Sequence, residues 1–171
     1  RQVRISQTDI PVLTCASVKD ENGYRFAIGA RPARAQIYAQ PVDKTAEQMA
    51  EAVAEGAKSA GAEVTLANVN DFDSSSVADF DGIAFGCPAM GAEVLEDSEF
   101  EPVFNECESA LNGKSIALFG SYGWGDGEWM RNWEDTCKGD GANLVCESVI
   151  CNDAPDDDAL EACKKLGASL A

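Results

Sequence analysis

From about residue 35 onward, short apolar runs alternate with longer amphipathic stretches, and this alternation constrains the fold more than any other feature of the sequence. A short, uninterrupted apolar run is typical of a parallel strand that is covered on both faces. Two such runs, 82–87 and 114–120, are each followed at once by a glycine-rich loop. The alternation predicts an α/β fold in which helices cover both faces of a parallel sheet and a ligand lies beyond the carboxyl ends of the strands.

The expected elements follow from the spacing of apolar residues. Strands are expected at 35–39, 62–69, 82–87, 114–120 and 143–151, and helices at 45–60, 100–111, 128–138 and 156–170. The first segment instead predicts a β-hairpin, because two β-prone runs, 10–18 and 24–29, flank turn-forming residues. We therefore expect two parts, a hairpin over 1–35 and an α/β domain over 36–171.

Charge divides the chain at nearly the same place. The chain has 30 acidic and 13 basic residues, a net charge of −17, of which residues 1–40 contribute +3 and residues 41–171 contribute −20. An acidic surface repels nucleic acids and anionic membranes, so neither is expected as a partner. It favours docking to basic surfaces on partner proteins, although charge alone is equally compatible with a merely soluble acidic protein.

The cysteine pattern indicates free thiols rather than a metal site. The chain has seven cysteines, no histidine and no Cys-x-x-Cys pair. We therefore expect buried thiols in a reducing cytoplasm, and no metal ligands. No run approaches the length that a membrane span needs, and the chain opens on Arg1 rather than Met, which suggests a fragment of a longer protein.

The two glycine-rich loops carry the residues that can bind a planar ligand. In the first, GCPAMGAE (86–93), Met90 offers a polarizable sulfur to an aromatic face and Glu93 offers an acceptor to a ring N–H. In the second, GSYGWGDG (120–127), Trp124 stands among glycines, where a large aromatic favours stacking on a flat ligand. The alternatives are a simple loop with Met90 in the core, and a surface loop in which the tryptophan has no role.

These loops and their flanks, 86–102 and 118–134, closely resemble short-chain flavodoxins of the clostridial type, and the resemblance runs from about Gln36 to the C-terminus. It implies a flavodoxin-like, three-layer, doubly wound sheet of five parallel strands in the order 2-1-3-4-5, with the hairpin as an appendage. It also implies non-covalently bound FMN and low-potential electron transfer to redox partner proteins, rather than an enzyme with its own substrate.

The resemblance implies roles for individual residues. Trp124 would stack on one face of the flavin and Met90 on the other, Glu93 would accept from the ring N3–H, and the Gly91 carbonyl would respond to the protonation state of N5. In the family, the turn after this methionine changes its peptide orientation on one-electron reduction. The expected cofactor-binding residues are Pro88, Ala89, Met90, Gly91, Ala92, Glu93, Ser121, Tyr122, Gly123, Trp124, Gly125, Asp126 and Thr45.

The acidic residues of this region have a functional interpretation as well. Seven acids lie between Glu93 and Glu108, close to the expected flavin site. An added electron is disfavoured among fixed negative charges, which predicts a low reduction potential. The alternative is that most of these acids only solvate a helix.

The sequence departs from the flavodoxin pattern where the FMN phosphate would bind. Flavodoxins use a loop rich in serine, threonine and glycine at a helix N-terminus, whereas 39–45 contains no glycine. Pro41 removes a donor and Asp43 repels phosphate, so only Lys44 and Thr45 can contribute. The alternative function is therefore a flavodoxin-fold docking or structural module of a larger flavoprotein dehydrogenase that has lost tight FMN binding.

Residues 1–35 resemble a different protein class. The segments 9–13 and 27–35 are similar to the C-terminal subdomain of the FAD-binding subunit of xanthine and carbon-monoxide dehydrogenases. This resemblance implies a junction of two flavoprotein pieces, with the phosphate loop lost at the seam and the chain belonging to a larger dehydrogenase.

Overall fold

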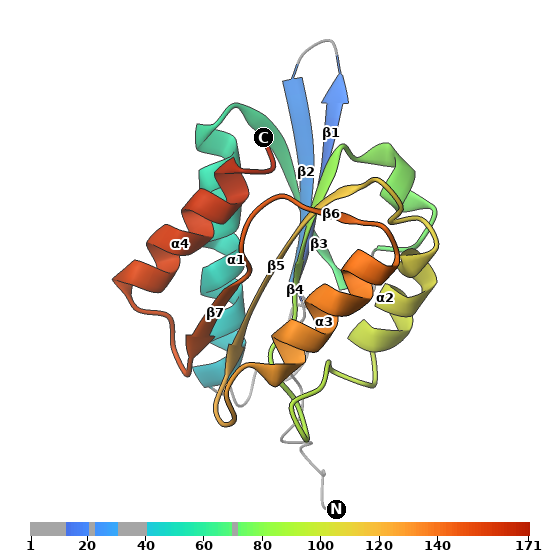
Figure 1. The fold of residues 1–171 in the computed structure, drawn as a ribbon. Helices are drawn as coiled ribbons and strands as arrows, with labels where there is room; N and C mark the ends of the chain where they lie inside the picture. Colours follow the sequence, from blue (N-terminus) through green and yellow to red (C-terminus); the bar gives the residue numbers. More distant parts are fainter. Residues whose placement is uncertain (1–12, 21–22, 31–40, 70–71) are drawn as a thin grey trace, which may run out of the picture.

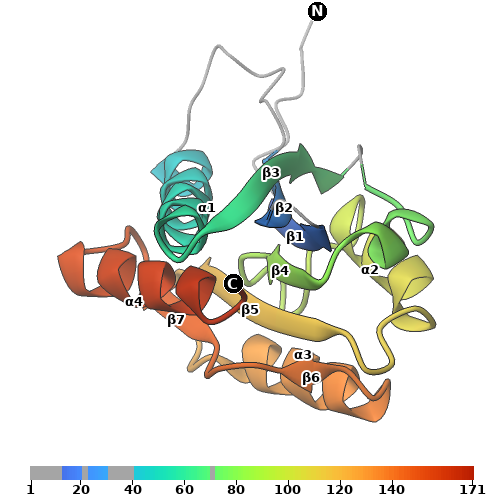
Figure 2. The same ribbon diagram turned by 90° about the horizontal axis from the view of Figure 1, so that it is seen from above.

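The computed structural model describes residues 13–20, 23–30, 41–69 and 72–171, with side chains from residue 47 onward except at residue 68. A central sheet is covered by α1 and α4 on one face and by α2 and α3 on the other (Figures 1 and 2). The strands are β1 Leu13–Asp20, β2 Gly23–Ala30, β3 Ala62–Asn68, β4 Gly82–Gly86, β5 Ser115–Tyr122, β6 Asn143–Leu144 and β7 Val149–Asn152. The helices are α1 Pro41–Ser59, α2 Phe100–Glu108, α3 Glu128–Gly139 and α4 Asp157–Ala168, with a 3-10 turn at Ser76–Asp79. The three-layer, flavodoxin-like α/β class predicted from the sequence is confirmed.

The strand order of the sheet is β3-β2-β1-β4-β5-β6. Strand β7 also pairs with β5, alongside a later part of β5 than β6 does. Strands β4 and β5 are parallel, as are β5 with β6 and with β7. The single strand expected at 143–151 is therefore split, because β6 pairs with the start of β5 and β7 pairs with its end. Strands β4, β5 and β7 therefore bring their carboxyl ends to one edge of the sheet.

The middle of the sheet differs from the predicted five-stranded order. The hairpin β1–β2 lies between β3 and β4 and is part of the sheet, whereas an appendage was expected. Strand β2 runs parallel to β3, and β1 runs antiparallel to β4. The inner edges of β3 and β4 carry backbone groups that need hydrogen-bond partners in the centre of a protein, and the hairpin supplies them. The strand expected at 35–39 lies outside the described residues.

Two hydrophobic layers hold the helices on the sheet. On one face, Phe100 and Phe104 of α2 pack edge-to-face against Trp133 of α3, with ring centroids 5.2 and 5.6 Å apart. On the other face, apolar residues of α1 such as Met49 and Val53 share a cluster with Leu166 of α4. Strand β4 is buried along its whole length, as its uninterrupted apolar run predicts.

Candidate functional site

The two glycine-rich loops lie side by side at the carboxyl ends of β4 and β5. Backbone hydrogen bonds continue the strand pairing into the loops, from the Cys87 N–H to Phe119 O at 3.1 Å and from the Ala89 N–H to Ser121 O at 2.8 Å. The Asp153 N–H donates to the Tyr122 carbonyl at 2.8 Å, which brings the end of β7 to the same place. The structure thus brings the predicted residues 88–93 and 121–126 together at the edge where ligands bind in open parallel sheets.

The first loop makes a tight turn after Met90. Met90 and Val94 exchange two backbone hydrogen bonds, at 2.8 and 2.9 Å, around the three residues between them. Gly91 has a φ of +49° and Glu93 has a φ of +54°, whereas Ala92 is not among the described residues with positive φ. Pro88 and Ala89 are buried, Met90 is half-buried, and Gly91 and Ala92 are exposed at the tip.

The second loop presents an aromatic side chain to solvent. Ser121 is buried, and the half-buried Tyr122 packs against Trp129 with ring centroids 5.4 Å apart. From Gly123 to Asp126 the loop is exposed, and 51% of Trp124 is accessible. The expectation that this tryptophan is poorly buried is therefore confirmed.

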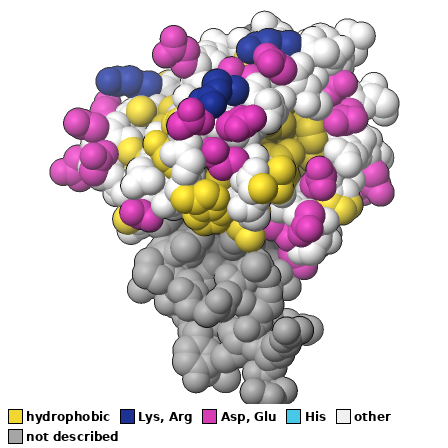
Figure 3. Space-filling model, turned by 60° about the horizontal axis from the view of Figure 1, so that its bottom comes forward, with side chains coloured by type: hydrophobic (Ala, Val, Ile, Leu, Met, Phe, Trp, Pro, Cys, Tyr) yellow, Lys and Arg dark blue, Asp and Glu magenta, His cyan; other side chains and the backbone are white. Residues whose placement is uncertain are grey.

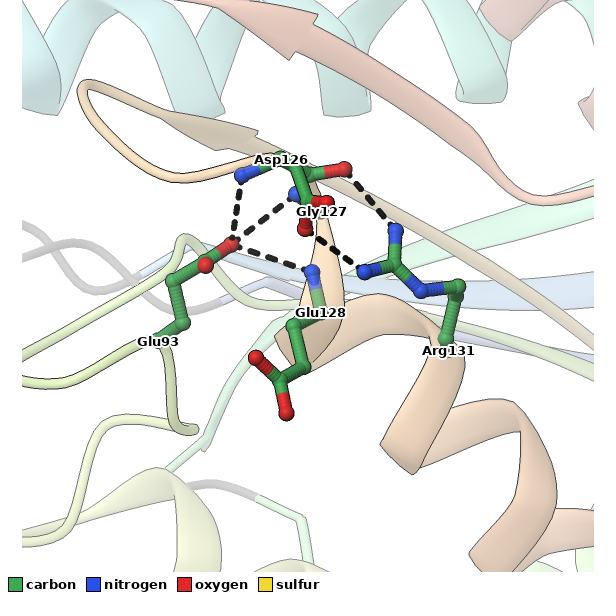
Figure 4. A network of polar contacts seen from close by, with 5 residues as sticks. All are labelled: Glu93, Asp126, Gly127, Glu128 and Arg131. Atoms are coloured by element: carbon green, nitrogen blue, oxygen red, sulfur yellow. Dashed lines mark hydrogen bonds and ion pairs between the residues drawn. The ribbon is translucent and has the colours of Figure 1, made fainter.

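Glu93 joins the two loops (Figure 4). Its Oε1 accepts hydrogen bonds from the backbone N–H groups of Asp126, Gly127 and Glu128, at 3.2, 2.9 and 3.0 Å. These amides form the N-terminus of α3, which has no side-chain cap of its own. A carboxylate at this position satisfies free donors and complements the helix dipole. The bonds also support the left-handed backbone of Glu93, a conformation that costs roughly 1–2 kcal/mol in a residue other than glycine.

Gly125 leaves the space that this carboxylate occupies. A Cβ built at Gly125 would overlap the carboxyl group of Glu93, and the φ of Gly125 is +84°. Among the described residues, no hydrogen bond uses the second carboxylate oxygen, Oε2. Glu93 therefore has one oxygen committed to α3 and one with acceptor capacity for a ligand N–H.

Arg131 holds the other side of the same loop, and the sequence analysis did not identify it. Its Nη1 donates to the Asp126 carbonyl at 2.9 Å, and its Nη2 pairs with Asp126 Oδ1 at 2.6 Å. Hydrogen bonding with Asp126, followed by the charges of nearby acids, raises the pKa of the Arg131 guanidinium above its usual value. The signal in the sequence was an acid and a base five residues apart across a helix start, a pattern that also occurs where the two side chains do not meet.

A second acid, in the connection from β4 to α2, anchors the start of α2. Glu96 is 4% exposed, and its carboxylate accepts from the backbone N–H groups of Ser98, Glu99 and Phe100 and from the Ser98 hydroxyl. Burial opposes ionisation of Glu96, but these hydrogen bonds outweigh it and lower the pKa of the carboxyl group. The loop 87–99 is thus tied to α3 through Glu93 and to α2 through Glu96.

Thr45 is the one expected site residue that comes from another part of the chain. It lies within α1, which begins at Pro41. The segment expected to bind phosphate therefore belongs largely to the start of this helix rather than to a loop. The side chain of Thr45 and residues 39–40 lie outside what the structure describes.

The edge that carries the loops is partly hydrophobic. Figure 3 shows hydrophobic side chains gathered on this face, with acidic side chains around them. Three of the large hydrophobic residues exposed in the described part of the chain come from this edge: Val94, Trp124 and Ile150. A flat aromatic ligand next to an acidic rim is compatible with such a surface.

The cysteines whose side chains are described do not contribute reactive thiolates to the site. Six of the seven cysteines in the described ranges have described side chains, and these six are free. Burial raises the pKa of Cys87 far above its ordinary value, that of Cys107, Cys137 and Cys163 to about 12, and that of Cys151 to about 11. Within the same ranges, no cluster of possible metal ligands is found, and no helix is both long and apolar enough to span a membrane.

Comparisons with known proteins agree with this geometry. The family model described as "Flavodoxin" matches residues 44–167. The flavodoxin of Clostridium beijerinckii is 43% identical over 125 residues, which cover 73% of this chain and 90% of the relative, and that of Megasphaera elsdenii is 42% identical over 73% and 89%. The solution structure of two-electron reduced Megasphaera elsdenii flavodoxin superposes with a TM-score of 0.68 at 44% identity, covering 74% of this chain and 90% of that one.

The comparisons also correct one expectation and extend another. They give no support to the resemblance of residues 1–35 to the FAD-binding subunit of xanthine and carbon-monoxide dehydrogenases. A putative diflavin flavoprotein of Synechocystis is 32% identical over 143 residues, which are 80% of this chain but 23% of that protein, so the same module occurs within larger proteins. The alternative of a docking module without flavin is not favoured. The chain belongs to the flavodoxin family, whose members transfer electrons through bound FMN.

Proposed function

We propose that the chain is a low-potential electron carrier that holds the flavin ring of FMN between its two glycine-rich loops. The observation that carries the proposal is the pairing of an exposed Trp124 in one loop with Met90 in the other, at the carboxyl ends of β4 and β5. The ring fits the residues present, because Oε2 of Glu93 has acceptor capacity and Gly125, which has no Cβ, leaves room for this carboxylate. When bound, FMN supplies the electron-accepting and electron-donating ring system.

The residues of the chain have separate tasks in this proposal. Trp124 and Met90 sandwich the ring and exclude water from its faces, and the Glu93 carboxylate accepts from the ring N3–H. The remaining expected residues of the two loops line the ring through backbone and small side chains, and Thr45 at the start of α1 serves the phosphate. The acids of 93–108 disfavour the added negative charge of the reduced cofactor, and so they lower the reduction potential.

The surface around the loops favours partners of opposite charge. Acidic side chains surround the hydrophobic face in Figure 3, and the whole chain carries a net charge of −17. We infer that redox partners dock through basic surfaces, so their association rate should fall as salt is added. As part of the same proposal, the protein acts in a reducing cytoplasm, which the free cysteines support.

Titration of the flavin-free chain with FMN and with riboflavin tests the proposal. Both should bind with strong quenching of flavin fluorescence, and with little preference between them because 39–45 lacks a glycine-rich phosphate loop. Each missing charge-assisted hydrogen bond costs roughly 1.5–3 kcal/mol. The affinity for FMN should therefore be several orders of magnitude lower than at a site with an intact phosphate loop. Failure to bind either flavin would overturn the proposed function. An FMN affinity a hundredfold above that of riboflavin would show that the start of α1 binds the phosphate strongly, against the expectation of a weak contact.

A further inference from the structure

The loop that carries Trp124 is intrinsically pliable. Asp126 lies between Gly125 and Gly127, which have φ values of +84° and +89°. Glycines in this region give the unrestrained backbone many alternatives. Gly127 is the N-cap of α3 and has no side-chain hydrogen bond of its own to hold the first turn. Contacts from outside the loop must therefore set its position.

Two side chains form hydrogen bonds with this loop from opposite sides (Figure 4). Glu93 accepts from the three amides at 126–128, which ties the second loop to the first. Arg131, one turn into α3, donates to both the carbonyl and the carboxylate of Asp126. The guanidinium is a planar fork, so two bonds to one residue fix the orientation of that residue as well as its distance.

We propose that Arg131 is a positioning residue for the flavin: by clamping Asp126, it keeps the amides of 126–128 on Oε1 of Glu93, and so directs Oε2 of Glu93 and the Trp124 ring to the ligand. The inference rests on the proposed function, because it assumes that the flavin ring lies between these loops. The side chains of Arg131 and Asp126 are 57% and 76% exposed, so the pair contributes little to global stability. Its effect should appear in local order and in ligand binding.

The test compares Arg131→Gln and Arg131→Lys in the full chain, with riboflavin as the probe. Riboflavin has no phosphate, so a general attraction of the arginine to an anionic ligand does not contribute. Without flavin, Arg131→Gln should accelerate hydrogen exchange at the amides of Asp126, Gly127 and Glu128. It should also raise the Kd for riboflavin roughly threefold to fivefold, the factor that corresponds to an exposed ion pair. Arg131→Lys should behave more like the glutamine variant than like the wild type, because lysine keeps the charge but not the fork.

Lys138→Gln is the matched control. Lys138 lies on the same helix and makes exposed ion pairs with Glu134 and Asp135, at 3.4 and 3.7 Å. Loss of Lys138 should leave both the hydrogen exchange at residues 126–128 and the Kd for riboflavin unchanged. In the Asp126→Ala background, Arg131→Gln should have little further effect on the Kd, as expected for two residues that act as one unit.

The outcomes separate the two proposals. If the wild type binds neither riboflavin nor FMN, the proposed function fails, and the positioning role fails with it. If the wild type binds and Arg131→Gln leaves the Kd unchanged, the proposed function stands and the positioning role is overturned. Full rescue by Arg131→Lys would also overturn it, because charge alone would then be sufficient.

Discussion

The indole N–H of Trp129 donates a hydrogen bond to the backbone carbonyl of Cys87 at 3.2 Å. This contact joins the first turn of α3 to the start of the loop after β4, and both residues are about 1% exposed. It therefore contributes to the rigid platform on which the two loops lie, in addition to the contacts made by Glu93. A buried carbonyl that lost this donor would have no water to replace it.

Trp129→Phe should destabilise the fold through this carbonyl. We expect a loss of about 1–3 kcal/mol in the free energy of unfolding beyond the cost of repacking, the usual penalty for a buried unsatisfied group. Trp133→Phe is the control, because Trp133 is also buried on α3 but its indole nitrogen has no hydrogen-bond partner among the described residues. Urea unfolding of both variants gives the comparison. Equal losses would mean that the Trp129 hydrogen bond contributes nothing beyond packing.

Glu96 should make stability depend on pH. The folded-state pKa of its carboxyl group lies below the ordinary value, so the ionised form stabilises the native state above the unfolded pKa. That stability is lost as the pH falls from the ordinary value of 4.5 through the lower folded pKa. Glu96→Gln should lower the free energy of unfolding by about 1–3 kcal/mol at neutral pH. It should also reduce the fall in stability that the wild type shows as the pH drops below 4.5. Glu106→Gln removes an exposed carboxylate from the neighbouring helix α2 and controls for the change in net charge; it should cost little at neutral pH.

Trp124→Ala should weaken flavin binding at a limited cost to the fold. Loss of aromatic stacking on a planar base costs about 1–3 kcal/mol. In the flavin-free protein 51% of Trp124 is exposed, so its removal should cost the fold less than removal of a fully buried tryptophan. Fluorescence titration and urea unfolding measure the two effects. Leu66→Ala is the matched control, because Leu66 is 44% exposed on β3, which lies at the opposite end of the sheet order from β7. Similar losses of flavin affinity in both variants would remove the case for stacking.

Ala92→Gly should raise the potential of the first one-electron reduction. If the peptide after Gly91 reorients on reduction, as the family resemblance implies, a type II turn would require a positive φ at Ala92, which it does not have in this structure. Alanine costs about 1 kcal/mol there, which is roughly 40 mV for one electron, since a tenfold change is ~59 mV. Redox titration of the bound flavin measures the shift, and Ala154→Gly in the loop after β7 is the control. An unchanged or lower potential in Ala92→Gly would mean that the turn does not change in this way.

Much of the fold could be predicted because its signals are local. The buried strand at 82–86 and the helix at 128–139 follow from apolar periodicity, which depends on side chains a few residues apart. The position of the two loops follows from the same signals, because neighbouring parallel strands end at one edge. The exposure of Trp124 also follows from its local setting among glycines, which leaves little to cover the ring.

Contacts between distant segments could not be predicted in this way. Gly56 and Gly167 look like weak points within their helices, yet a Cβ on either would lie 1.9 Å from a backbone oxygen of the opposing helix, so they permit α1 and α4 to pack closely. The insertion of the hairpin between β3 and β4 depends on unpaired strand edges that form only when the sheet assembles.

The sequence by itself determined most of the strands and helices, and which two loops carry the aromatic, sulfur and carboxylate groups of the proposed flavin site. Only the tertiary structure decided that the Glu93 carboxylate accepts from the N-terminal amides of α3, and that the Arg131 guanidinium binds Asp126 at the same helix start. The reason is that periodicity and glycine placement act over a single turn or strand. The direction of a carboxylate depends on donors brought to it from a segment about 34 residues away, and only the folded chain places those donors.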